Sequence, residues 1–181
     1  TVEEVVEDDL NSKAGQMKRL LERLVDHPEH DADLTTFIVG DMNSPSHLDW
    51  GEDNLAQNAG FAVVWPTSQM LVKSGFTDVY RELHPDPLSH RGFTYTSGYP
   101  KNVVISQEMQ ERIDFIYYRA GAAGVKVRLP SGAEARFFNN GSGLKADPVQ
   151  FYLHNEDPYP SDHRLLVASF DSPAADLRDV T

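Results

Sequence analysis

Cysteine is absent from the 181 residues, and this absence excludes several kinds of chemistry. Without thiols the chain has no disulfide, no thiolate zinc site, no iron–sulfur cluster and no cysteine nucleophile. No apolar run approaches the roughly 18 residues that a membrane span needs. A length of 181 residues with 40% hydrophobic side chains is enough for one globular domain.

Basic residues are scarce: 16 Lys and Arg stand against 28 Asp and Glu, which gives a formal net charge of −12. A nucleic-acid binder held mainly by basic patches is therefore disfavoured, because neutralising phosphates takes clustered Lys and Arg. An acidic enzyme whose metal ion handles the phosphate is not excluded. Much of the negative charge lies near the N-terminus, and residues 1–10 are expected to be a solvated acidic leader.

The hydrophobic pattern predicts a mixed chain of helices and strands, in the α/β (α+β) class. Apolar residues at helical spacing, from Met17 to Val25, predict an amphipathic helix over 12–26. Strands are expected at 35–39, 93–96, 112–119, 125–129 and 164–170, and further helices at 47–59, 67–73 and 76–82. Residues 139–148 are expected to form a loop and residues 172–181 a polar tail.

Acidic side chains stand at the ends of three of these strands. Asp41 follows the strand at 35–39, Asp114 lies near the start of the strand at 112–119, and Asp162 and His163 precede the last strand. If the first strand runs opposite to the other two, these side chains gather at one edge. Carboxylates concentrated at one edge suit a hard divalent cation, which prefers oxygen ligands.

Each acid also has a purely structural interpretation. Asp41 could be only a turn and helix-cap residue, Asp114 could pair with Arg112 or Arg119, and Asp162 with His163 could form a solvated turn. The combination favours chemistry, because a carboxylate inside an apolar strand needs a partner.

Other polar residues are expected to be structural. We expect Arg81 and Arg91 on the solvated surface, Asp78 bonded to loop backbone, and His47 and Asp49 in helix capping and packing.

Three short blocks resemble a known family when they are taken together. They are Gly40-Asp41-Met42-Asn43, Arg112-Ile113-Asp114-Phe115 and Ser161-Asp162-His163, and Phe93-Thr94-Tyr95 stands between the first two. In this order they resemble the metal-dependent endonuclease/exonuclease/phosphatase superfamily. The resemblance implies a DNase I-like four-layer sandwich. It covers residues 11–171, as about the C-terminal two-thirds of the family domain, with the N-terminal portion missing.

The resemblance also implies a role for each site residue. Asp41 would orient or deprotonate the attacking water, and Asn43 would donate to a phosphoryl oxygen. His163 would contact the scissile phosphate, with Asp114 fixing the orientation of its ring. Asp162 would help to hold Mg²⁺ or Mn²⁺, whose main ligands are expected in the missing portion.

These roles predict a metal-dependent phosphoesterase that hydrolyses a phosphate ester by in-line water attack. A phosphodiesterase or phosphatase acting on a small substrate is the first choice, because the acidic charge disfavours a nuclease acting on DNA or RNA. A non-catalytic interaction domain that retains the fold is the other alternative.

A domain that lacks its N-terminal portion has two expected consequences. We expect little or no activity from these residues alone, because the main metal ligands would be absent. An apolar sheet face would also lose its partner, so we expect self-association or pairing with the N-terminal half, against which a monomer in light scattering would count.

Overall fold

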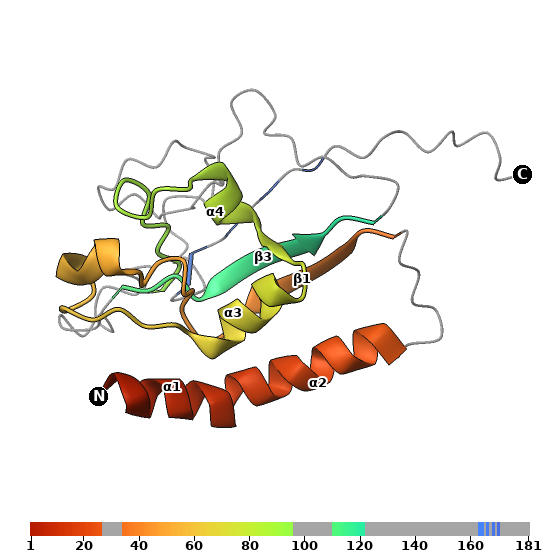
Figure 1. Cartoon of the computed structure of the whole chain (residues 1–181). Helices are drawn as coiled ribbons and strands as arrows, with labels where there is room; N and C mark the ends of the chain where they lie inside the picture. The colour runs from red at the N-terminus through yellow and green to blue at the C-terminus, as the bar shows by residue number, and fades with distance from the viewer. Residues whose placement is uncertain are drawn as a thin grey trace, which may run out of the picture.

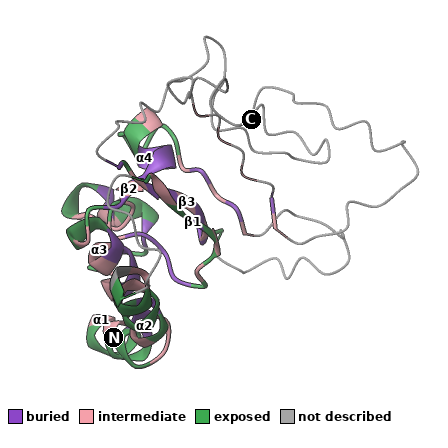
Figure 2. Cartoon of the chain, turned by 90° about the vertical axis from the view of Figure 1, so that its right-hand side faces the viewer, coloured by how far each residue is buried: buried purple, intermediate pink, exposed green. Residues whose placement is uncertain are grey.

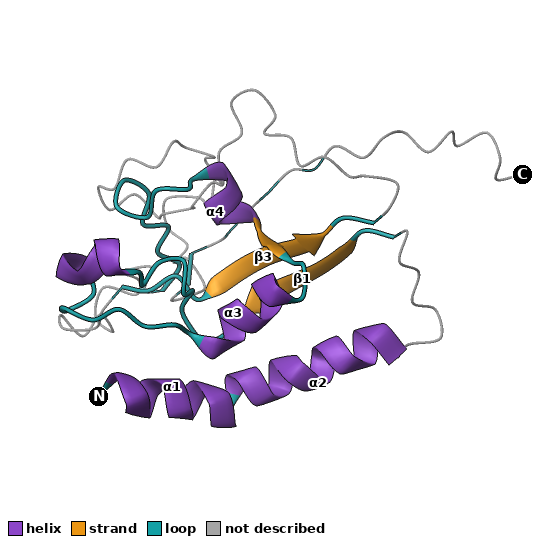
Figure 3. Ribbon diagram, in the orientation of Figure 1, coloured by secondary structure: helices purple, strands orange, loops and turns teal. Residues whose placement is uncertain are grey.

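The structure is a computed structural model that describes residues 1–26, 34–95, 110–121, 163, 164, 166, 168 and 170. Figures 1 and 3 show helices on one side of a small sheet. The elements, in chain order, are α1 (Val2–Asn11), α2 (Lys13–Asp26), β1 (Thr36–Asp41), the 3₁₀ helix η1 (Glu52–Gln57), α3 (Pro66–Lys73), β2 (Thr77–Asp78), α4 (Val79–Leu83) and β3 (Asp114–Arg119). Helices and an antiparallel sheet together confirm the α/β class at this level.

The sheet has the strand order β1-β3-β2, and both pairings are antiparallel. The predicted strands at 35–39 and 112–119 are therefore confirmed, with small shifts at their ends. Register runs from Thr36 opposite Arg119 to Asp41 opposite Asp114. Because β1 and β3 run in opposite senses, the end of β1 meets the start of β3. This is the arrangement that brings Asp41 and Asp114 to one edge, as predicted.

The hydrophobic core lies between the sheet and the helices α2 and α3. β-Branched and aromatic residues favour strands, and alternate side chains of β1 and β3 point to this face. Figure 2 shows exposed residues over the outward surfaces of α1 and α2, and buried residues toward the sheet. The buried members of the core are Met17, Ile38, Leu71, Phe76, Phe115 and Tyr117, with Met42 packed against them. Among the described residues, no helix is long and apolar enough to cross a membrane.

The opposite face of β1 carries apolar side chains in contact with solvent. Phe37 is 43% exposed and Val39 is 64% exposed, on the face that does not meet α2 and α3. The four-layer arrangement, the absence of an N-terminal portion and self-association through this face stay predictions, and light scattering tests the last of them.

The structure differs from the expected acidic leader at residues 1–10. This segment is helix α1, with Thr1 as its N-cap in a capping box with Glu4. Asp9 is only 1% exposed and accepts hydrogen bonds from the backbone and the hydroxyl of Thr67. The bond to Thr67 gives Asp9 a buried partner and ties α1 to the rest of the fold. The leader was predicted from its net charge alone, and net charge does not indicate whether an acid has such a partner.

Two of the predicted helices also differ. In place of a helix over 47–59 there are turns followed by η1, because the side-chain amides of Asn54 and Asn58 donate to the Asp49 carbonyl and favour a tight loop. In place of a helix from residue 76, β2 comes first, and Asp78 then caps α4 through the backbone N–H groups of Tyr80 and Arg81. The predictions for 125–129, 139–148 and 172–181 lie outside the described residues.

Candidate active site

Two carboxylates face each other at one end of the sheet. Asp41 ends β1 and Asp114 begins β3, and the two residues are direct partners across the antiparallel pair. Their side chains are 32% and 21% exposed, so solvent reaches them. Like charges directly opposite in a sheet destabilise it, so this pair needs a neighbouring positive group.

His163 joins the two carboxylates into one cluster. Its Nδ1 lies 2.8 Å from Asp114 Oδ2, and its Nε2 lies 3.9 Å from Asp41 Oδ2. An ionised carboxylate can only accept, so Nδ1–H is the donor and the ring is held in one orientation. Tyr95 pairs with His163 in an antiparallel bridge, and the centroids of their rings lie 5.1 Å apart.

Asn43 is fixed to Asp41 by a local turn. The Asp41 carboxylate accepts from the Asn43 backbone N–H at 2.7 Å and from Asn43 Nδ2 at 3.0 Å. Asn43 has φ 47°, a left-handed conformation that asparagine adopts more readily than most residues. The motif around Asp41 therefore builds a rigid corner that aims one carboxylate and one amide at the same edge.

Thr94 fixes the start of β3. Its hydroxyl is fully buried and accepts from the backbone N–H groups of Ile113 and Asp114, at 3.0 and 3.1 Å. The described residues of the Phe93-Thr94-Tyr95 block therefore anchor Asp114 through Thr94 and contact His163 through Tyr95. The sequence predicted Tyr95 only as part of the strand at 93–96, and its contact with His163 had no signal in the local pattern.

Of the five predicted site residues, the structure brings four together. Asp41, Asn43, Asp114 and His163 form one cluster, and ligand atoms of Asp41, Asp114 and His163 lie within 4.8 Å of one another. Asp162 lies outside the described residues.

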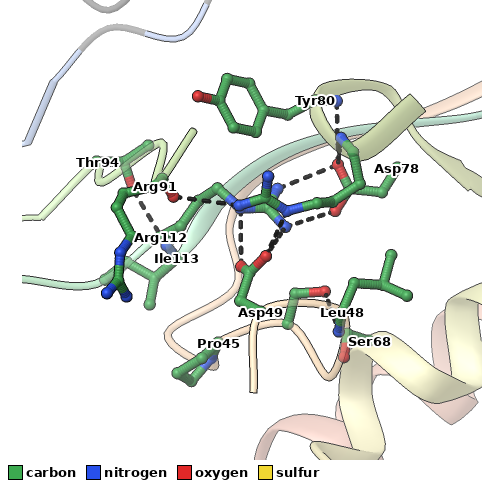
Figure 4. Close-up of polar contacts among 12 residues, drawn as sticks. Pro45, Leu48, Asp49, Ser68, Asp78, Tyr80, Arg91, Thr94, Arg112 and Ile113 are labelled. Carbon is green, nitrogen blue, oxygen red and sulfur yellow. Dashed lines mark hydrogen bonds and ion pairs between the residues drawn. The ribbon is translucent and has the colours of Figure 1, made fainter. Parts of the chain in front are cut away.

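Arg112 does not pair with Asp114, which corrects one structural alternative. Its guanidinium instead lies between Asp49 and Asp78, at 2.9 Å from Asp49 Oδ2 and 2.7 Å from Asp78 Oδ2 (Figure 4). Burial by itself would lower the pKa of Arg112, but the two carboxylates raise it above its ordinary value. The Asp114 carboxylate therefore pairs with His163 and not with Arg112.

The prediction of a solvated Arg81 is wrong. Arg81 is 6% exposed, its Nε lies 2.5 Å from Asp49 Oδ1, and its Nη1 donates to the carbonyls of His84 and His90. Asp78, expected to bond to loop backbone, accepts from backbone N–H groups of α4 as that helix's N-cap, and it also pairs with Arg112. We call Asp49, Asp78, Arg81 and Arg112 the arginine–aspartate cluster. It was missed because its members come from three separate parts of the chain.

Some of the possible ligand atoms at this edge of the sheet suit a hard divalent cation. Asp41 and Asp114 supply carboxylate oxygens, which Mg²⁺ and Mn²⁺ prefer, and they are partly exposed to solvent. His163 Nδ1 bonds to Asp114, which leaves Nε2 as the ring nitrogen that faces Asp41.

A strand-edge cluster of two carboxylates, one histidine and one asparagine is typical of hydrolytic enzymes. Residues 8–163 match the Endonuclease/Exonuclease/phosphatase family. The chain therefore belongs to this family, whose members are generally hydrolases acting on phosphate esters. The match begins at residue 8, within α1.

One relative among the curated proteins is an uncharacterized protein of Caenorhabditis elegans. It is 30% identical over 157 residues, which is 85% of this chain and 44% of the relative. The chain thus spans less than half the length of this relative, whose printed description assigns no activity.

Proposed function

We propose that this chain carries the water-activating part of a metal-dependent phosphoesterase, a phosphodiesterase or phosphatase for a small substrate. The observation that supports the proposal most is the bond of 2.8 Å between His163 Nδ1 and Asp114, with Nε2 on the side of Asp41. A histidine held in this way can transfer a proton at Nε2 while the carboxylate stabilises the charged ring.

The carboxylate of Asp41 has a different role in the proposal. Its oxygens already accept from Asn43, so its orientation is fixed before substrate binds. It would orient or deprotonate the attacking water, while the Asn43 amide donates to a phosphoryl oxygen as charge develops there. Preorganised donors of this kind contribute without further reorganisation during the reaction.

A divalent cation, Mg²⁺ or Mn²⁺, would neutralise the phosphate, held by carboxylate oxygens with Asp162 as the ligand that the sequence predicts. A nuclease is the weaker alternative, because a formal net charge of −12 repels a polyanionic backbone away from the cation. An interaction domain without activity is weaker still, since it has no use for a histidine that is hydrogen-bonded to one carboxylate and lies beside a second.

The proposal predicts that His163→Ala and Asp114→Asn, made in the full-length protein, each lower kcat by about 10²–10⁴-fold, the usual contribution of a positioned acid or base. The assay is hydrolysis of bis-p-nitrophenyl phosphate and p-nitrophenyl phosphate with added Mg²⁺. The two substrates also separate diester from monoester cleavage.

His47→Gln is the matched control, because His47 is half-buried and hydrogen-bonded to Ser68 outside the cluster. It should keep the wild-type rate. A His163→Ala enzyme with the wild-type rate on both substrates would refute the proposal.

A further inference from the structure

A cavity of about 220 Å³ lies beside the arginine–aspartate cluster. Its lining includes Trp50, Gln57, Arg91, Phe93, Gln110 and Glu111. Pockets for larger ligands usually measure roughly 300–1,000 Å³, so this one has room for a single ring. Its lining mixes aromatic rings, amides and charged groups.

The arginine–aspartate cluster lines one side of the cavity, and most of its N–H donors are engaged within the protein. Arg112 donates to both carboxylates of the cluster (Figure 4), and Arg81 donates to Asp49 and to three backbone carbonyls. These bonds hold that side of the cavity in place, and the other lining residues are the better source of specific contacts to a ligand.

Arg91 and Glu111 are the charged residues of the lining that remain available. Within the described ranges, no ion pair engages either side chain, and the Arg91 guanidinium lies over the Phe93 ring at 5.7 Å. Burial lowers the pKa of Arg91 and raises the pKa of Glu111. Glu111 is the more buried of the two, and a carboxylate drawn out of water is destabilised when no partner is present, so its position favours a ligand that donates to it.

The backbone at Gly92, beside the cavity, lies close to the Tyr80 ring. Gly92, between Arg91 and Phe93, has φ 69° and lies against the Tyr80 ring where a side chain would collide. This contact fixes the chain that carries Arg91 and Phe93 beside the cavity.

Glu111 is separated from the catalytic cluster by one chain segment. Tyr95 forms antiparallel bridges to Glu111 on one side and to His163 on the other. Neighbouring extended segments lie about 4.8 Å apart, so the Glu111 and His163 backbones are about 10 Å apart. A ring attached to a phosphate at His163 can reach across this distance.

We propose that this cavity binds the alcohol part of the phosphate ester, a polar ring with both hydrogen-bond donors and acceptors, as in a nucleoside or a sugar. The inference rests on the proposed function and names its substrate class. Glu111 accepts from the ring, Arg91 donates to it, the amides of Gln57 and Gln110 do either, and Trp50 packs on its face.

Other alcohol parts fit less well. An alkyl chain would leave Arg91 and Glu111 against hydrocarbon. A choline-like cation would meet Arg91, and a polyphosphorylated ring would need several cations where the lining offers Arg91 beside Glu111. A neutral polar ring satisfies both charges at once.

The test uses the fluorescence of the chain, whose two tryptophans lie together, with Trp50 lining the cavity and its ring 5.6 Å from that of Trp65. Adenosine monophosphate and glucose phosphate probe the two kinds of ring, with phosphocholine and inorganic phosphate beside them. We expect a saturable change with one ring compound and none with inorganic phosphate. Arg91→Met and Glu111→Gln should each weaken that binding about tenfold, the usual effect of losing a bond to a charged group.

Arg23→Met and Glu22→Gln, both exposed on α2, are the matched controls and should bind as the wild type does. Urea unfolding of every variant shows that it is folded, and Arg91→Lys should recover part of the binding. Wild-type affinity in both cavity variants, tightest binding of phosphocholine, or no response to either ring would overturn the inference.

The two proposals fail separately. If His163→Ala keeps wild-type hydrolysis while the ring still binds through Arg91 and Glu111, only the catalytic proposal is wrong. If the wild type hydrolyses phosphate esters but no ring binds in the cavity, only this inference is wrong.

Discussion

His47 illustrates how a single hydroxyl can fix a titratable side chain. Ser68 Oγ accepts from the His47 backbone N–H at 2.8 Å and lies 2.8 Å from His47 Nδ1. Ser68 is 3% exposed, so the imidazole is drawn partly out of water. This burial lowers the pKa of His47, and the carboxylates of Asp49 and Asp78 oppose the shift only in part.

The lowered pKa predicts how stability depends on pH. Below the ordinary value of 6.5, the unfolded chain protonates His47 while the folded chain resists protonation. The unfolded state then binds more protons, so the free energy of unfolding decreases as pH falls from 6.5 toward the folded pKa. His47→Gln should lose less stability than the wild type between pH 7 and pH 5. Urea unfolding at both pH values measures this, and an equal or larger loss in the variant would contradict it.

The residues of the candidate site could be predicted from sequence because each is part of a short local block. Asp41 and Asn43 stand two residues apart, and the buried strand around Asp114 is visible in its apolar pattern. The pairing of Asp114 with His163 joins residues 49 positions apart, so no local pattern contains it, and it was predicted only through the family resemblance. The arginine–aspartate cluster also joins distant residues, but it matched no such block and was missed.

At the scale of elements, a contact between residues far apart in the sequence explains why helix α1 was not predicted. Helix α3 has Trp65 at its N-cap, and the Trp65 side chain makes no capping hydrogen bond to the first backbone N–H groups. Asp9, 58 residues earlier, accepts from Thr67 N at 2.8 Å and so caps α3 from another helix. The acidic run could not be read as a helix from composition, because its one buried acid has its partner far along the chain.

This bond makes Asp9 the residue through which α1 stabilises α3. Asp9→Ala leaves the Thr67 N–H and hydroxyl buried without their acceptor, so the free energy of unfolding should fall by about 1–3 kcal/mol. Asp8→Ala is the control, because Asp8 is exposed and pairs with Lys13 at the surface, and its loss should change little. Urea unfolding compares the two variants; equal effects would show that Asp9 is not a cap.

At the scale of the whole molecule, the arginine–aspartate cluster joins segments that the helices and strands leave apart. Asp49 comes from the turns after β1, Asp78 and Arg81 from β2 and α4, and Arg112 from the chain entering β3. The Arg112 guanidinium also lies 4.5 Å from the Phe115 ring centroid. Arg112 is two residues from Asp114, so the cluster holds the start of the strand that carries this carboxylate of the candidate site.

Removing the guanidinium of Arg112 should therefore affect the entire fold. Arg112→Met leaves Asp78, 1% exposed at its side chain, without its cationic partner, and the free energy of unfolding should fall by about 3–5 kcal/mol. Arg91→Met removes an equal charge without breaking an ion pair among the described residues, and should change stability far less. Adding Asp78→Asn to Arg112→Met should recover part of the loss, because it removes the charge left behind. Chemical unfolding of the four proteins measures these differences. A loss in Arg112→Met no larger than in Arg91→Met would mean that packing, and not the ion pairs, holds these segments together.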